Sequence, residues 1–315
     1  MRRNFRLSLA LALTLTLFGL QPVRAQTASQ NSTPAENRQA CASGTFIGCF
    51  NLGLLLYRGE GIAQNKAQAA AFFDQACAGG FADGCDVIGQ MYHNGDGVEQ
   101  NKTKAAEFFN KACTGGVLMS CNYLGNAYYN GSGITQNKAQ SATLYDKACT
   151  GGIAASCNTL GAMNAKGEGV AQNKARAAAL YDKACSGGDT QGCRNLGVAY
   201  DKGEGAAQNK AQAAALFDKA CNGGMASSCF DLGAKYLTGD GVAESMAQAE
   251  ALFDKACTGG MADGCSAVGA MNEGGGGSVQ NKAKAIAYFR KALAIDPHDG
   301  IAAEALKKLS AAEQK

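Results

Sequence analysis

Fourteen cysteines recur along the chain with a strict period of 36 residues, two in each period. A fixed period of this length is typical of a solenoid, in which each unit buries its apolar face only against its neighbours. Seven residues separate the two cysteines of a unit. The sequence therefore predicts one array of seven units. Its cysteine pairs are Cys41 and Cys49, Cys77 and Cys85, Cys113 and Cys121, Cys149 and Cys157, Cys185 and Cys193, Cys221 and Cys229, and Cys257 and Cys265.

Two helices are expected in each unit, and in the first unit they span residues 48–58 and 66–78. Asn65 is a suitable N-cap for the second helix, and Gln68 can complete a capping box. A Gly-Gly pair ends that helix, as glycine often does at a C-cap. Apolar residues in it follow the spacing of one helical face. They are Ala69, Phe72, Phe73 and Ala76.

A glycine stands in the middle of the first helix of every unit, beginning with Gly53. Such a glycine costs about 1 kcal/mol relative to alanine. Because all seven units contain it, we expect close backbone packing against a neighbouring helix. The equivalent residues are Gly89, Gly125, Gly161, Gly197, Gly233 and Gly269.

Both ends of the array are predicted to be incomplete units. Residues 34–40 are enough only for part of a helix. At the other end Leu293 and Ile301 occupy the two cysteine positions, and residues 299–312 are expected to form a polar closing helix. The predicted fold is an all-α solenoid of seven α/α hairpins with a C-terminal capping helix.

The first 25 residues have the form of a secretory signal peptide. Three arginines precede an uncharged apolar run over residues 7–20, and small residues, Val23 and Ala25, stand before the expected cleavage site. That run is shorter than the roughly 20 residues that span a bilayer. Cleavage after Ala25 removes four arginines and no acid, so the formal charge changes from +3 to −1. We therefore expect an exported protein, periplasmic or secreted.

The near-neutral mature chain is a poor match for nucleic-acid binding, which depends on clustered positive charge. No later segment is apolar and long enough to span a membrane. A monomer is expected. The predicted organisation is a signal peptide at 1–25, a linker and partial helix at 26–40, the repeat array at 41–295, and the capping helix with its tail at 296–315.

An even number of cysteines in an exported chain indicates a disulfide framework. Cysteines eight positions apart can pair only if the Gly-Gly corner reverses the chain, because a continuous helix would separate their α-carbons by about 12 Å. A rival pairing joins cysteines 28 positions apart, such as Cys49 and Cys77. The rival leaves Cys41 and Cys265 unpaired, whereas the local pairing closes all seven pairs. Counting therefore favours the local pairing.

Other roles fit these cysteines less well. Zinc sites favour two to four residues between paired cysteines, and the only histidines are His93 and His298. The redox motif Cys-x-x-Cys is absent. A cysteine nucleophile needs an adjacent base, and seven equivalent copies argue against one special thiol. We expect no metal ion and no cofactor.

The unit combines a Cys-x7-Cys pair, a Leu-Gly in the first helix, a Gly-x-Gly loop and a Lys-Ala-Cys at the end of the second helix. Over roughly residues 41–300 this combination resembles the cysteine-rich Sel1-like repeat proteins, in particular the Helicobacter cysteine-rich protein family. The resemblance implies a right-handed superhelix of α/α hairpins, each with a disulfide between cysteines eight apart. It also implies an adaptor that binds a protein or peptide partner.

The same resemblance implies an alternative function. Members of the cysteine-rich group are described as penicillin-binding proteins with slow β-lactamase activity, which would make a β-lactam or a cell-wall-related molecule the ligand. The chain contains no Ser-x-x-Lys, Lys-Thr-Gly or Gly-x-Ser-x-Gly motif. His93 is expected to be a surface residue at the end of a first helix. No catalytic residue is identified, so enzymatic activity stays open at this point.

The binding surface is expected on the first helices, which by resemblance line the concave side. Positions equivalent to 51, 54, 55 and 58 lie off the repeated core face and differ among units. They form either a partner-binding stripe or a solvated surface that is free to vary. Their mixture of amide, positive and aromatic groups suits an extended peptide. The predicted contact residues are Asn51, Arg58, Tyr123, Asn126, Lys166, Asn195, Lys202, Asp231 and Lys235.

Overall fold

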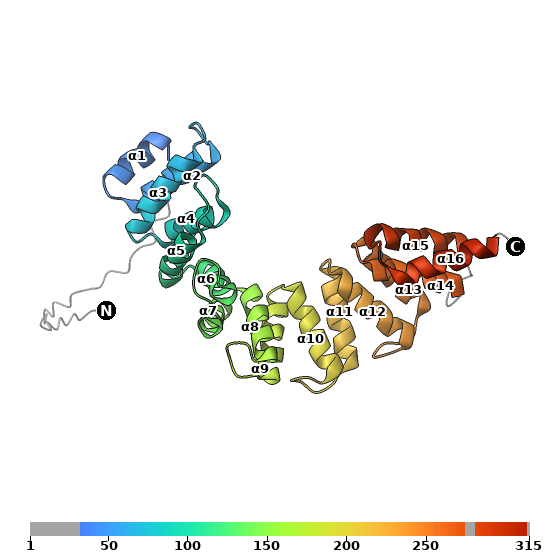
Figure 1. Ribbon diagram of the computed structural model, residues 1–315. Coiled ribbons are helices and arrows are strands. Elements are labelled where there is room, and N and C mark those ends of the chain that lie inside the picture. The colour runs from blue at the N-terminus through green and yellow to red at the C-terminus, as the bar shows by residue number, and fades with distance from the viewer. Residues whose placement is uncertain (1–31, 275–280, 314–315) are drawn as a thin grey trace, which may run out of the picture.

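The computed structural model describes residues 32–274 and 281–313. These ranges contain sixteen α-helices and no strand, and the helices follow one another along a curved path with the two ends far apart (Figure 1). The predicted signal peptide lies outside the described residues. The helices are α1 (Pro34–Ala42), α2 (Phe46–Arg58), α3 (Lys66–Ala78), α4 (Ala82–Asn94), α5 (Lys102–Thr114), α6 (Leu118–Asn130), α7 (Lys138–Thr150), α8 (Ala154–Lys166), α9 (Lys174–Ser186), α10 (Thr190–Lys202), α11 (Lys210–Asn222), α12 (Ala226–Thr238), α13 (Met246–Thr258), α14 (Ala262–Gly274), α15 (Lys282–Ile295) and α16 (Gly300–Glu313).

Each helix packs on the next one along the chain, so that α2 with α3, α4 with α5 and so on to α14 with α15 form seven units. The predicted all-α solenoid of seven hairpins is confirmed. Direct contacts also join α8 to α10 and α14 to α16. Equivalent helices of successive units approach each other most closely on the inner side of a curved array. These contacts therefore place the even-numbered helices on the inner side.

The helix boundaries match the prediction within two residues in the first unit, but the predicted capping box is only half present. Asn65 Oδ1 accepts a hydrogen bond from the Gln68 N–H at 3.0 Å, as an N-cap does. The Asn65 N–H instead donates to the carbonyl of Leu56 at 2.9 Å. The Gln68 side chain is therefore not needed there, and the bond to Leu56 ties the start of α3 back to α2.

Seven disulfides join cysteines eight positions apart, with α-carbons 4.4–4.7 Å apart. Each bond connects the end of an odd-numbered helix to the start of the next even-numbered helix. The corner between them needs glycine, since Gly80 has φ +87°. The local pairing is confirmed, and no free cysteine remains.

The glycine in the middle of each even-numbered helix makes room for an aromatic ring. A Cβ on Gly53 would lie 2.7 Å from Cε1 of Phe73, and one on Gly125 would lie 2.9 Å from Cε1 of Tyr145. Close packing was correctly predicted, but the contact is with a side chain of the paired helix and not with a neighbouring backbone. The rings in this position are Phe73, Phe109, Tyr145, Tyr181, Phe217, Phe253 and Phe289.

The C-terminal end closes as predicted. Asp299 caps α16, because its Oδ1 accepts from the Ala302 N–H at 2.9 Å while its Oδ2 accepts from the Ser266 hydroxyl at 2.7 Å. The second contact ties the closing helix to α14. Among the described residues, no helix has the length and apolarity needed to cross a bilayer.

Candidate interaction surface

Three hollows lie between successive even-numbered helices, and each has an aromatic ring of the intervening odd-numbered helix in its lining. The α4–α6 hollow measures about 330 Å³ and contains Phe109. The α8–α10 hollow measures about 130 Å³ and contains Tyr181. The α10–α12 hollow measures about 540 Å³ and contains Phe217. The surface predicted on the inner helices is therefore hollowed at three of the junctions between units.

The α4–α6 hollow combines one aromatic wall with polar groups and no acid. The rings of Phe109 and Tyr123 lie with centroids 5.1 Å apart. Lys102 forms no ion pair with any residue that the structure describes. The complete lining is His93, Lys102, Ala105, Ala106, Phe109, Tyr123, Asn126, Ala127, Asn130 and Ser132.

The amide of Asn126 has a fixed orientation in this hollow. Burial raises the pKa of Tyr145 to about 12, so its hydroxyl remains protonated at neutral pH. That hydroxyl donates to Asn126 Oδ1 at 2.6 Å. The Asn126 Nδ2 is therefore left as the hydrogen-bond donor that Asn126 can offer to a bound molecule.

The α8–α10 hollow is smaller, and its polar groups bond to one another. Asn195 donates from Nδ2 to Asn158 Oδ1 at 2.8 Å and accepts from Gln191 Nε2 at 3.0 Å. Lys174 Nζ lies 3.3 Å from Glu204 Oε2. Little hydrogen-bonding capacity remains for a partner.

The α10–α12 hollow is the largest, but it is crossed by internal ion pairs. Lys235 Nζ lies 2.5 Å from Asp201 Oδ1 and 2.8 Å from Asp240 Oδ2, and the Lys235 side chain is only 8% exposed. Burial alone would lower the Lys235 pKa, but hydrogen bonds to the two carboxylates outweigh it, so the pKa is raised. Arg194 Nε also lies 2.9 Å from Asp231 Oδ2. The charges of this hollow are therefore largely satisfied within the protein.

The predicted contact residues fall into four groups. Tyr123 and Asn126 line the α4–α6 hollow, and Asn195 lines the α8–α10 hollow. The α10–α12 hollow contains three more, Lys202, Asp231 and Lys235, although the last two are engaged in the ion pairs described above.

The remaining three predicted residues line none of these hollows. Arg58 is exposed, with its Nη1 3.8 Å from Glu60 Oε1. Lys166 is exposed at the end of α8, and Asn51 is half-buried in α2.

Several lining residues escaped the prediction, in particular His93, Lys102, Ser132, Arg194 and Asp201. His93 is exposed as expected, yet it lines a hollow. These residues stand at positions that the predicted stripe did not include, in the second or last turn of the even-numbered helix, the first turn of the odd-numbered helix and the Gly-x-Gly loop. All of these positions vary among units except that of Lys102, where six of the seven units have lysine. Comparison of every unit position, and not only one helical face, would have found all of them but Lys102, whose lysine recurs.

The linings of these hollows offer apolar surface and hydrogen-bonding groups. All fourteen cysteine sulfurs are in disulfides, so none is a free nucleophile. No hydrogen bond joins the Ser132 hydroxyl to His93 or Lys102 within the described ranges, so the contact between nucleophile and base is missing there. The described residues also include no cluster of three or more His, Cys, Asp or Glu side chains placed to hold a metal ion.

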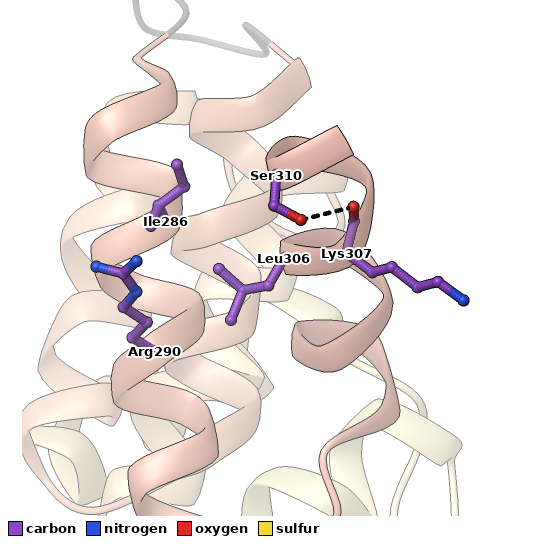
Figure 2. A pocket seen from close by; sticks show the side chains of 5 residues that line it. All are labelled: Ile286, Arg290, Leu306, Lys307 and Ser310. Carbon is purple, nitrogen blue, oxygen red and sulfur yellow. Dashed lines mark hydrogen bonds between the residues drawn. The ribbon is translucent and has the colours of Figure 1, made fainter. Parts of the chain in front are cut away.

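A fourth hollow lies at the C-terminal end, between α15 and α16 (Figure 2). Ile286 and Arg290 come from α15, and Leu306, Lys307 and Ser310 come from α16. The Ser310 hydroxyl donates to the Lys307 carbonyl at 3.0 Å. This hollow lies against the closing helix and is separate from the three along the inner helices.

The chain matches the sequence profile described as "Sel1 repeat" seven times in succession. The matched residues are 47–81, 82–117, 118–153, 154–189, 190–225, 226–261 and 262–294. A search of curated protein sequences returned no match.

Three solved structures are similar to this chain, and the first two share its fold. The protective antigen c5321 of uropathogenic Escherichia coli, described as displaying an SLR fold, is 26% identical with a TM-score of 0.80, and the match covers 84% of this chain and 56% of the antigen. A Sel1 repeat protein from Oxalobacter formigenes is 22% identical with a TM-score of 0.66, covering 78% of this chain and 96% of that one. Cysteine-rich protein B of Helicobacter pylori is 27% identical over 41% of this chain and 98% of its own, with a TM-score of 0.34. The chain spans little more than half the length of the E. coli antigen.

Proposed function

This chain belongs to the Sel1 repeat family, and from that premise we propose that it is an exported scaffold that binds an extended segment of a protein partner along its even-numbered helices. Repeat scaffolds of this kind commonly mediate protein interactions. One observation carries the proposal. The positions that hold the fold together are nearly the same in every unit, whereas the hollow-lining positions on the even-numbered helices and in the Gly-x-Gly loops differ from unit to unit.

The constant positions have a structural explanation in each unit. They comprise the disulfide, the glycine with its aromatic ring, and the N-cap. No such explanation covers Asn130 or Thr238 in the hollow linings. Hollows with aromatic floors and polar rims suit a polypeptide, whose main-chain amides need hydrogen bonds and whose side chains need apolar contact.

Export is the second part of the proposal. Seven disulfides are consistent with an oxidising compartment. The N-terminal 25 residues supply the signal, and we propose that residues 26–40 form the linker and partial helix, 41–295 the array, and 296–315 the cap and tail. The mature protein is proposed to be a monomer with no nucleic-acid partner. Sequencing the N-terminus of the exported protein should identify Gln26 as the first residue.

Site-specific photo-crosslinking tests the binding surface. A photoreactive residue at Asn130 or Thr238, which line two of the hollows, should form adducts with a partner protein in an envelope extract of the source cells. The matched control places the same residue at Asn110 or Asp218, which are exposed on odd-numbered helices at equivalent positions. Adducts that form equally from both sets, or only from the control set, would contradict the proposed surface.

A further inference from the structure

At two junctions between units, the protein holds one of its own carboxylates between a lysine and a tyrosine. Lys66 Nζ lies 2.8 Å from Asp96 Oδ1, and the Tyr57 hydroxyl donates to Asp96 Oδ2 at 2.5 Å. Hydrogen bonds lower the pKa of Asp96, and the bond from Lys66 contributes more than the bond from Tyr57. This arrangement is therefore a built carboxylate site, in which the acid is supplied by the Gly-x-Gly loop of the following unit.

The same arrangement returns two units later. Lys138 Nζ lies 3.0 Å from Glu168 Oε2, and the Tyr129 hydroxyl donates to the same carboxylate. Hydrogen bonds from Tyr129 and then Lys138 lower the pKa of Glu168. Aspartate and glutamate both occupy the site, so its geometry accepts either acid.

The junction between these two has the lysine but no acid. Its three equivalent residues are Lys102, Ser132 and His93, and all three line the α4–α6 hollow. The loop approaches the helix as it does at the first junction. A Cβ on Gly97 would lie 2.5 Å from Lys66 Cβ, and one on Gly133 would similarly overlap the backbone of Lys102. The loop of Ser132 therefore lies against Lys102 as the loop of Asp96 lies against Lys66, but it supplies no carboxylate.

This absence is specific to one junction among the five whose lysine and loop residue are both described. The other four have an acid in the loop, and each lysine lies within 3.3 Å of it. The pairs are Lys66 with Asp96, Lys138 with Glu168, Lys174 with Glu204, and Lys210 with Asp240. Of these five lysines, Lys102 and Lys174 line hollows, and the hollow of Lys102 has no acidic residue in its lining.

We propose that the α4–α6 hollow binds the acidic side chain, aspartate or glutamate, of an extended partner peptide. The partner carboxylate takes the position that Asp96 occupies at the first junction, with Lys102 in the place of Lys66 and His93 in the place of Tyr57. Charge complementarity carries this choice, because the hollow offers a cation and hydrogen-bond donors without a competing acid. The inference rests on the proposed function and adds the chemistry of the partner.

The rest of the hollow suits the residues that flank such an acid. Phe109 and three alanines provide apolar contact. The Asn126 Nδ2 donor, fixed by Tyr145, can bond a main-chain carbonyl of the peptide. The segment recognised is therefore an acid flanked by apolar residues.

A matched pair of variants tests the inference. Ser132→Glu supplies the missing carboxylate from within the chain, whereas Ser132→Gln adds the same bulk without charge. The probes are fluorescent, C-terminally amidated and N-terminally blocked hexapeptides in which apolar residues flank a central Glu, and the same peptides with Gln. Fluorescence anisotropy measures their dissociation constants from the disulfide-bonded mature chain.

Wild type should bind the Glu peptides at least about tenfold more tightly than the Gln peptides, as expected when a charge-assisted hydrogen bond is gained. Ser132→Glu should remove this preference, Ser132→Gln should retain it, and Lys102→Met should remove it. Equal binding of Glu and Gln peptides would overturn the inference and leave the proposed function standing. Binding of no peptide would overturn both. A third probe is the Gln peptide with a free C-terminus. If it binds more tightly than the amidated Glu peptide, the site is assigned to a chain-terminal carboxylate and the inference is overturned.

Discussion

The α4–α6 and α10–α12 hollows are formed by equivalent helices, but they differ in whether their charged side chains are paired within the protein. In the α10–α12 hollow, Lys235 and Arg194 are held by carboxylates of the protein itself. In the α4–α6 hollow, Lys102 has no such partner among the described residues. The comparison teaches that a larger hollow is not a better binding site when its polar groups are already satisfied. The smaller α4–α6 hollow has the greater number of hydrogen-bonding groups that are free to contact a partner.

The largest expected effect concerns the disulfides, which both hollows have at equivalent positions. Removing the Cys113–Cys121 disulfide or the Cys221–Cys229 disulfide, by changing both cysteines to alanine, should cost about 2.6 kcal/mol in the chain-entropy estimate for a nine-residue loop. Hydrogen exchange, which resolves local stability, should show equal losses around the two hollows. Clearly unequal losses would show that the frame is not equivalent in the two regions.

The next largest effect is a difference in stability when the lysine of each hollow is replaced. Lys235→Met should destabilise the protein by about 1–2 kcal/mol, less than for a fully buried pair because the two carboxylates are 31% and 33% exposed. Methionine fits this position, since Met91, Met163 and Met271 occupy it in other units. Lys102→Met should stay within about 0.5 kcal/mol, because no internal ion pair is lost. Urea unfolding measures both, and equal losses would remove the electrostatic distinction.

A smaller effect is expected when the α4–α6 hollow is given an internal ion pair like those of the α10–α12 hollow. Ser132→Glu should stabilise the chain by less than about 1 kcal/mol, because its carboxylate gains Lys102 in a solvent-exposed setting. The gain should shrink in high salt, as expected for an exposed ion pair. Ser132→Gln serves as the control and should show neither change in thermal unfolding. A stabilisation of the same size in both variants would indicate packing and not charge.

The smallest effect is a pH dependence at the first junction. A carboxyl whose pKa is lowered on folding, such as that of Asp96, adds stability above its unfolded pKa of about 3.9. This stability is lost as the pH falls through the lower, folded value. Asp96→Asn should therefore be less stable than wild type at neutral pH, and the difference should disappear in acid. The exposed Glu99→Gln is the control. A difference that is constant with pH would contradict the carboxylate site.

Much of the fold could be predicted from the sequence because its determinants are local and repeated. The period fixes the units, the Asn65 cap fixes a helix start, and the glycine corner fixes the disulfide pairing. The partner of Gly53 was not predictable from the helix alone. Phe73 lies twenty positions away on the paired helix, and its contact depends on how two helices cross.

The candidate site was predictable only in part. Tyr123 and Asn126 were found because they vary on the expected helical face. Asp231 and Lys235 were found by the same criterion, yet their charges belong to internal ion pairs with residues 37 and 34 positions earlier. A variable charged residue can therefore be either a contact or an internal partner, and only the spatial arrangement decides which.

The position of the disulfides also determines how the protein responds to proteolysis. Each bond bridges a corner, so a cut between Cys149 and Cys157 leaves the two parts covalently joined. A cut in a Gly-x-Gly loop, such as the one containing Ser132, separates the chain into two pieces held together by packing alone. A protease therefore finds its effective targets in these loops. Backbone hydrogen bonds restrain five of them, those of Asp96, Ser132, Glu168, Glu204 and Asp240, and an ion pair to a lysine of the preceding unit adds to the restraint in all but that of Ser132. Among these five loops, we therefore expect the one with Ser132 to be cut first.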